Sequence, residues 1–406
     1  MAKKIAKKAP AKKSKAAAKG NGKAVRPDLS RSPAMKGLIV QAQDIHGEIK
    51  GGRRPSLRVP IRSLSNVTFS LRKGFFTIGK KVSKRTLSYQ TIKPFAQTVR
   101  MMAFAKHLIE TDDFASKREV YYNSKGSTKR SSEPGSAGWG PAAFKEQPES
   151  DAIMDDMEAM VGVNREQLGF IPAEQNGSVA GELIVIDIDP ATGRRIEIDC
   201  TAFGRGSYSI PSRVEGIQFR TKAKFVLAVE TAALFERLNG HAYWRDSKCI
   251  VVAMGGVPSR ANRRFVRLLS DSCKLPVYVF TDGDPYGYGN IYRTMKVGSG
   301  NAAHISEYFC VPHAKLLGVT PQDIKDYDLP THPLEEKDKN VPRMPLRTIP
   351  SSGTPKSGLA PCRRWSKWGC VLNSRPLLHG ASITLWIPTC RKNYVIPVRC
   401  SPREGT

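Results

Sequence analysis

Three short apolar runs, separated by helical patterns, constrain the fold of this chain more than any other feature. The runs are Phe225–Val229, Ile250–Met254 and Val277–Phe280. Their nearly continuous apolar character is typical of strands buried on both faces of a parallel sheet. Helices are expected over Thr231–Leu238, Ser259–Ser270 and Tyr286–Met295. Alternating strands and helices predict an open α/β domain, which we place at residues 221–338.

Acidic residues directly follow two of these runs. Glu230 comes after the first run, and Asp282 and Asp284 come after the third with a glycine between them. Functional groups in an open α/β sheet gather beyond the carboxyl ends of the strands. Asp-x-Asp alone is more often a solvated loop, but a strand-terminal Glu in the same domain makes the pattern more specific. Because Mg²⁺ prefers a few carboxylates and can stabilise charge on a reacting phosphodiester, these three acids predict a magnesium site.

A second candidate group is a pair of tyrosines in Ser116–Tyr122. Ser116 and Glu119 match a capping box, so a helix should begin near Lys117. Arg118 and Tyr122 then lie on one face, four residues apart. A guanidinium there would favour the phenolate and hold a phosphate. Geometry does not choose between Tyr121 and Tyr122, and two rings packing in a core is the alternative.

The N-terminal half divides into four predicted parts. Residues 1–35 are expected to form a disordered basic arm that contacts nucleic acid, since residues 1–26 hold ten Lys/Arg and no acid. A solubilising or targeting tail is the alternative. Residues 36–65 are a short N-terminal extension with extended runs at Gly37–Gln43 and Ser56–Ile61. Residues 66–172 begin with a strand-like run over Val67–Ile78. Helices follow around Phe95–Ile109 and over Ser150–Glu166, and the whole suits a winged-helix module. Residues 173–220 are a linker region with a β-hairpin, formed by Glu182–Asp189 and Arg195–Cys200.

Residues 339–406 differ in composition from the rest of the chain. They hold twelve Lys/Arg, one acid, nine prolines and four cysteines, without a sustained period. We expect an atypical tail in which a frameshift has replaced the original C-terminus; a genuinely divergent disordered tail is the alternative. The cysteines show no CxxC spacing, and no signal peptide or membrane-length apolar run is present. A cytoplasmic, nucleoid-associated protein without a membrane partner is expected.

The segment from about Gly74 to Leu334 resembles the A subunit of topoisomerase VI, in the family that also includes the meiotic double-strand-break transesterase. The matching stretches are Ser116–Tyr122, Glu146–Asp151, Gly255–Arg260 and Thr281–Gly289. Two departures are an apparently longer loop at Gly126–Pro141 and the end of the resemblance near Lys337.

The resemblance implies a winged-helix (CAP-like) domain followed by a Toprim α/β domain. It implies that Tyr122 forms a 5′-phosphotyrosyl link with the assistance of Arg118, and that Glu230, Asp282 and Asp284 hold Mg²⁺. The tyrosine of one protomer would work with the acids of the other, in an A₂B₂ heterotetramer acting on double-stranded DNA. A B-type ATPase subunit would bind ATP, and no Walker A loop occurs here.

The expected function is therefore the DNA-cleaving subunit of an ATP-dependent type IIB topoisomerase that relaxes supercoiled DNA. A stand-alone break-forming transesterase would use the same chemistry without strand passage. A Toprim nuclease or primase would need no tyrosine. A non-catalytic chromatin protein would use only the basic arm and an inactive enzyme fold.

Overall fold

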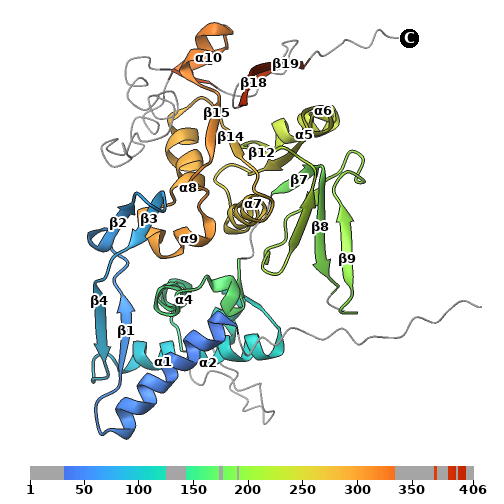
Figure 1. The fold of residues 1–406 in the computed structure, drawn as a ribbon. Helices are drawn as coiled ribbons and strands as arrows, with labels where there is room; N and C mark the ends of the chain where they lie inside the picture. The colour runs from blue at the N-terminus through green and yellow to red at the C-terminus, as the bar shows by residue number, and fades with distance from the viewer. Residues whose placement is uncertain are drawn as a thin grey trace, which may run out of the picture.

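The computed structural model describes residues 32–124, 143–172, 177–189, 192–333 and three short strands at 370–372, 383–389 and 392–398. Figure 1 shows a helical unit below a central sheet, with a smaller sheet at one side. No described helix combines the length and apolar character needed to cross a membrane.

The helical unit consists of α1 (Pro33–Lys50), α2 (Ile92–Thr111), α3 (Lys117–Asn123) and α4 (Gln147–Val161). These four helices share one core, to which α1 contributes Ala34, Met35 and Leu38. The extended run expected over Gly37–Gln43 is wrong. The side chain of Ser32 instead accepts a hydrogen bond from the Met35 N–H at 3.1 Å, and Pro33 begins a helix.

Helix α2 contains the helix expected around Phe95–Ile109, which confirms that prediction. The helix expected over Ser150–Glu166 has different bounds. It begins earlier, as α4, and ends at Val161 because Gly162 has a φ of 75°. A short 3-10 helix, η3 (Arg165–Leu168), follows. Two-residue strands β5 (Ala115–Ser116) and β6 (Phe170–Ile171) pair in parallel beside it.

Two β-ribbons follow α1 along the chain. The first pairs β1 (Ser56–Pro60) with β4 (Val82–Thr86), and the second pairs β2 (Val67–Ser70) with β3 (Phe75–Ile78), so strands occur where Ser56–Ile61 and Val67–Ile78 predicted them. The turn η2 (Leu64–Asn66) connects the ribbons. In Figure 1 the first ribbon lies beside α1, and the second lies beside α8 and α9.

The central sheet has the order β10-β7-β13-β12-β14-β15. Its strands are β7 (Ser178–Gly181), β10 (Tyr208–Ser209), β12 (Phe225–Val229), β13 (Cys249–Ala253), β14 (Val277–Phe280) and β15 (Lys315–Gly318). Strands β13, β12, β14 and β15 are parallel, which confirms the predicted parallel sheet. The chain runs from β12 to one neighbour and then crosses to the other, so the strand order reverses at β12, where open α/β sheets place their sites.

Helices cover both faces of this sheet. Phe225, Leu227 and Val229 face a core with α5 (Ala232–Gly240) and α6 (Tyr243–Ser247). The alternate residues Val226 and Ala228 face α7 (Arg260–Cys273). Burial of every residue of β12 and β13 explains why these runs are uniformly apolar.

The predicted hairpin is present as β8 (Leu183–Ile188) and β9 (Arg195–Asp199), and β11 (Gln218–Thr221) adds a third strand on the other side of β8. Phe219 of β11 packs edge-on against Phe265 of α7, with ring centroids 5.0 Å apart. This small sheet therefore packs onto the α7 side of the central domain.

The remaining elements follow β14. They are the π-helix η4 (Gly287–Tyr292), α8 (Arg293–Lys296), η5 (Gly300–Ile305), α9 (Ser306–Phe309), α10 (Pro321–Asp326) and the strands β16 (Thr331–Pro333), β17 (Cys370–Leu372), β18 (Ile383–Thr389) and β19 (Lys392–Val398). Strand β16 pairs with β17, and β18 pairs with β19. Most of the residues 339–406, like the basic arm up to residue 31 and the loop at 126–141, lie outside the described residues. The predicted origin of the tail stays a prediction.

Candidate active site

The three predicted metal-binding acids lie at one edge of the central sheet. Glu230 directly follows β12, and its N–H donates to the carbonyl of Phe280 in β14 at 3.0 Å. The Asp282 N–H in turn donates to Oε2 of Glu230 at 2.8 Å. The ends of two neighbouring strands thus hold the Glu230 carboxylate against the Asp-Gly-Asp loop.

The Asp-Gly-Asp loop is tightly folded. Oδ1 of Asp284 accepts the Gly287 N–H at 2.5 Å, at the start of the π-helix. A Cβ at Gly287 would lie 2.7 Å from the carbonyl oxygen of Asp282, so only glycine fits here without moving the loop.

Electrostatics at this edge favour a cation. Burial raises the pKa of Glu230 to about 7, helped by the neighbouring charges of Asp282 and Asp284 and opposed by the hydrogen bond from the Asp282 N–H. Three mutually repelling oxygen donors are the set that a hard divalent cation would stabilise. The described residues nevertheless contain no group of three His, Cys, Asp or Glu side chains arranged to hold a metal ion. The acids are gathered at one edge, and the Glu230 and Asp284 carboxylates meet backbone N–H groups.

The tyrosine-bearing helix α3 begins as predicted. Ser116 and Glu119 form a capping box, in which the Glu119 N–H donates to the Ser116 hydroxyl at 3.1 Å. The two tyrosines then differ in environment. The Tyr121 hydroxyl donates to the carbonyl of Lys145 at 3.0 Å, whereas Tyr122 is 59% exposed. Arg118 is also exposed, one helical turn before Tyr122.

An ion pair fixes α3 to α4. Lys117 contacts Asp151 at 2.6 Å, and Asp151 belongs to the Glu146–Asp151 stretch that begins α4. Within that stretch Glu149 accepts hydrogen bonds from Lys93 and from the Lys145 N–H, both at 2.8 Å. The polar residues of this stretch therefore position the helix that carries the tyrosine.

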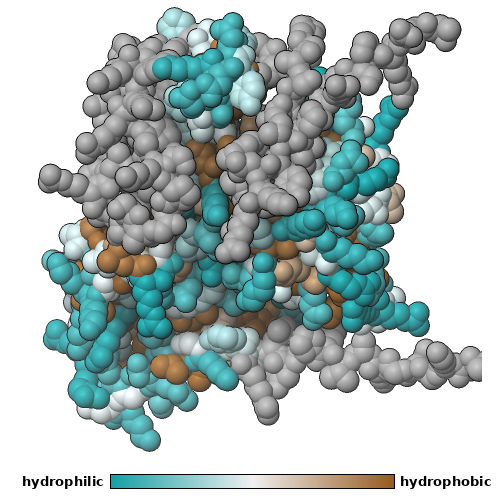
Figure 2. Space-filling model, turned by 45° about the horizontal axis from the view of Figure 1, so that its top comes forward, coloured by the Kyte–Doolittle hydropathy of each residue, from teal (hydrophilic) through white to brown (hydrophobic). Residues whose placement is uncertain are grey.

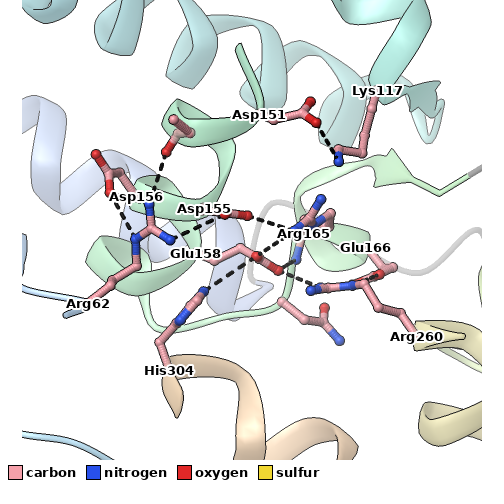
Figure 3. Close-up of polar contacts among 12 residues, drawn as sticks. Arg62, Lys117, Asp151, Asp155, Asp156, Glu158, Arg165, Glu166, Arg260 and His304 are labelled. Carbon is pink, nitrogen blue, oxygen red and sulfur yellow. Dashed lines mark hydrogen bonds and ion pairs between the residues drawn. The ribbon is translucent and has the colours of Figure 1, made fainter. Parts of the chain in front are cut away.

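A buried ionic network joins the helical unit to the central domain (Figure 3). Glu158 of α4 has a fully buried side chain and contacts Arg260, the first residue of α7, at 2.5 Å. Arg165 contacts the same carboxylate at 3.3 Å, and His304 lies 3.6 Å from it. Arg260 also reaches Glu166 at 2.7 Å. We call these five residues the interdomain network.

In the interdomain network, the positive charges of the arginines offset the negative charges of the two glutamates. Burial alone would raise the pKa of Glu158, but Arg260, His304 and Arg165 outweigh it and hold that pKa well below its ordinary value. The Arg260 guanidinium also stacks over the Phe309 ring at 4.6 Å. A carboxylate that stays charged while buried requires these partners.

Sequence reasoning missed the interdomain network. A signal was available, because Asp151, Asp155 and Glu158 recur at helical spacing and Arg260 ends the Gly-Gly-Val-Pro-Ser-Arg stretch. A glycine pair can allow a close backbone approach, and Gly255-Gly256 lies in that stretch. Nothing lies within 4 Å of a Cβ at either position; both residues instead have positive φ, of 71° and 86°.

The predicted nucleophile and the predicted metal-binding acids lie in different parts of the chain. Tyr122 belongs to the helical unit, and Glu230, Asp282 and Asp284 follow strands of the central sheet (Figure 1). We call these two groups of predicted site residues the two half-sites.

Comparisons with known proteins match this division. Residues 93–170 match the family model "Type IIB DNA topoisomerase", and residues 173–223 match "All-beta domain in DNA topoisomerase VI alpha subunit". Residues 225–351 match the model of the Toprim domain that the topoisomerase 6 A subunit shares with Spo11.

Curated relatives agree with the family models. A protein of Methanocaldococcus jannaschii, named as the A subunit of type 2 DNA topoisomerase 6, is 48% identical over 315 residues, which cover 77% of this chain and 82% of that relative. Proteins of the same name from Pyrococcus abyssi and Archaeoglobus fulgidus are 38% and 35% identical, over 76% and 75% of this chain and 76% and 81% of their own lengths.

Proposed function

This chain belongs to the family of type 2 DNA topoisomerase 6 A subunits, and from that membership we propose how it works as the DNA-cleaving subunit of a type IIB topoisomerase. The observation that carries the proposal is the pairing of an exposed tyrosine in the helical unit with strand-end acids in a Toprim domain. DNA is the substrate, and a B subunit is the partner.

Tyr122 is the proposed nucleophile. Its phenolic oxygen attacks a backbone phosphorus, the new O–P bond links the tyrosine to the 5′ phosphate, and the bond to the 3′ oxygen breaks. The phenolic proton leaves Tyr122, and the 3′ oxygen departs as a hydroxyl after protonation. The exposure of Tyr122 supports this assignment, because the Tyr121 hydroxyl is already committed to the Lys145 carbonyl.

Arg118 is the proposed assistant of Tyr122. One helical turn separates the two residues, and both are exposed. A guanidinium at that place favours the phenolate over the phenol and can hold a phosphate oxygen with two N–H groups. We assign it no other role.

Glu230, Asp282 and Asp284 are the proposed metal-binding residues. A Toprim domain in a topoisomerase indicates the use of a divalent metal ion, and oxygen donors of this kind fit Mg²⁺. When bound, the ion would supply positive charge to offset the developing charge on the phosphate and the leaving oxygen. The raised pKa of Glu230 supports a site whose carboxylates are stabilised by a cation.

The assembly we propose is an A₂B₂ heterotetramer in which two copies of this chain form a dimer and the B subunits bind ATP. The separation of the two half-sites within one chain supports a site completed by a second copy. We also propose that the helical unit is a winged-helix (CAP-like) DNA-binding module, and that the protein is cytoplasmic and associated with the nucleoid.

The test combines the chain with supercoiled DNA, Mg²⁺, ATP and a cognate B subunit. We expect relaxation, together with DNA linked through its 5′ ends to protein after denaturation. Tyr122→Phe should abolish the adduct, while the matched variant Tyr121→Phe should retain it. An adduct that persists in Tyr122→Phe would contradict the assignment. An adduct without relaxation would favour the stand-alone transesterase, and nicking without any adduct would favour a Toprim nuclease.

A further inference from the structure

Positive charge is concentrated in one folded segment outside the two half-sites. From Ile49 to Ile109 the chain has fourteen Lys/Arg and no Asp or Glu. Residues 27–338 as a whole carry a formal charge of only +8, so the rest of that range is net negative. The segment contains both β-ribbons and α2, and the proposed catalytic chemistry uses none of its residues.

The β1–β4 ribbon separates its charges onto two faces. On the inner face Leu57 and Val59 are buried, and Arg85 contacts Asp156 of α4 at 2.7 Å. On the outer face Arg58 and Lys84 are both exposed and directly opposite each other in the strand register. Opposed cross-strand side chains have Cβ atoms about 5 Å apart, and like charges there destabilise the pair.

Other exposed cations lie near the two ends of this ribbon. Arg53 and Arg54 precede β1, Lys80 precedes β4, and all three are exposed. We call these three, with Arg58 and Lys84, the basic ribbon. In the described part of the chain none of the five forms an ion pair. The nearby acid is Glu48, whose carboxylate accepts the Ser56 hydroxyl and the Ser56 N–H, the latter at 2.6 Å. The hydrogen bond from the Ser56 hydroxyl is the main cause that lowers the pKa of Glu48, and the charges of Lys84 and Arg53 contribute less.

No ion pair among the described residues neutralises the exposed Arg58 and Lys84 pair, so this face favours the binding of an external anion. The five-residue strands span about 17 Å, which is comparable to about five base pairs of duplex. Where Figure 1 places β1 and β4, the surface in Figure 2 is mostly hydrophilic. This shape and charge suit a phosphate backbone better than an apolar partner.

We propose that the basic ribbon binds the phosphate backbone of duplex DNA, as an accessory contact outside the tyrosine and metal half-sites. The inference rests on the proposed function for its choice of duplex DNA as the partner. The ribbon is attached to the cleaving unit, since Arg62 binds Asp155 and Asp156 of α4 (Figure 3). Phosphate contacts carry no sequence information, so the contribution is the same on any sequence.

The test measures the salt dependence of DNA binding by the full-length chain in EDTA, where cleavage is prevented. Two fluorescent duplexes of about 40 base pairs and unrelated sequence are used. The variant Arg58→Gln/Lys84→Gln removes the opposed pair. Its matched control is Lys222→Gln/Lys224→Gln, which removes two exposed lysines at the amino end of β12, opposite Glu230.

Each lost phosphate contact lowers the slope of log K against log salt by about 0.9, so the ribbon variant should lose about 1.8 on both duplexes. The control should keep the original slope. The melting temperature of the ribbon variant should stay level or rise, because a like-charge pair is removed. An unchanged slope, or an equal loss in the control, overturns the proposal.

Two further outcomes separate this proposal from others. Weaker binding of the B subunit with an unchanged DNA slope would assign the ribbon to a protein partner and overturn the DNA contact. A reduced slope in a chain that never forms a tyrosine adduct would support the ribbon and contradict the proposed cleavage chemistry.

Discussion

Replacing Glu230 with Gln tests the electrostatics of the strand-end acids. Gln keeps the shape and the oxygen that accepts the Asp282 N–H, but it removes the charge. The pKa of Glu230 rises from 4.5 to about 7, mainly through burial. Each pKa unit corresponds to about 1.36 kcal/mol, so ionised Glu230 costs the metal-free folded chain about 3 kcal/mol.

The pH dependence has a definite sign. A carboxyl whose pKa is raised on folding stabilises the fold fully below about pH 4.5, and this stabilisation is lost as the pH rises through about 7. In EDTA we therefore expect Glu230→Gln to be more stable than the original chain at pH 8.5, by up to about 3 kcal/mol. The difference should shrink toward pH 5.

Urea denaturation of both chains at these two pH values, with and without Mg²⁺, measures this effect. Mg²⁺ should stabilise the original chain more than the variant, because ligand binding to the folded state adds to stability. A Glu230→Gln chain that is less stable at pH 8.5 in EDTA, or a difference that does not change with pH, would refute the reasoning.

Three other substitutions give separate expectations. Arg260→Met leaves the Glu158 carboxylate buried without its shortest ion pair and should cost about 3–5 kcal/mol in urea denaturation, with a smaller combined effect when Glu158→Gln is added. Additive losses would contradict the coupling. Gly287→Ala should destabilise the chain by about 1–3 kcal/mol and sharply reduce DNA cleavage, because its Cβ displaces the Asp-Gly-Asp loop. Normal cleavage would show that the loop tolerates the shift. Lys117→Met should change stability by at most about 1 kcal/mol, since its pair with Asp151 is partly exposed, yet lower the yield of tyrosine-linked DNA. An unchanged yield would remove Lys117 from the positioning of α3.

The parts of the fold that could be predicted from the sequence are those in which burial alone determines the pattern. Strands β12 and β14 have the predicted bounds, because both lie in the middle of a sheet that is covered on two faces. The extended run expected over Gly37–Gln43 failed for a physical reason. In α1 only Ala34, Met35 and Leu38 are buried, so its exposed apolar residues obscured the helical period.

The candidate site was predictable to different degrees. Glu230 and Asp282 each follow a strand of the parallel sheet, and this position in the sequence was enough to predict that they lie at one edge of the sheet. The choice between Tyr121 and Tyr122 could not be made from spacing, because it depends on a hydrogen bond to Lys145, twenty-four residues further along the chain. Contacts such as Glu158 with Arg260 join segments that are 102 residues apart, so the helical spacing of the acids could indicate a polar face of α4 but not its partner.

The interdomain network has a mechanical consequence. Separating α4 from α7 inside one chain would expose the charges of Glu158 and Arg260 to solvent or leave them buried without a partner. Either result costs several kcal/mol. We therefore expect the helical unit that carries Tyr122 and the central sheet to move together. In the proposed dimer we therefore expect any opening to occur between the two chains and not between α4 and α7 of one chain.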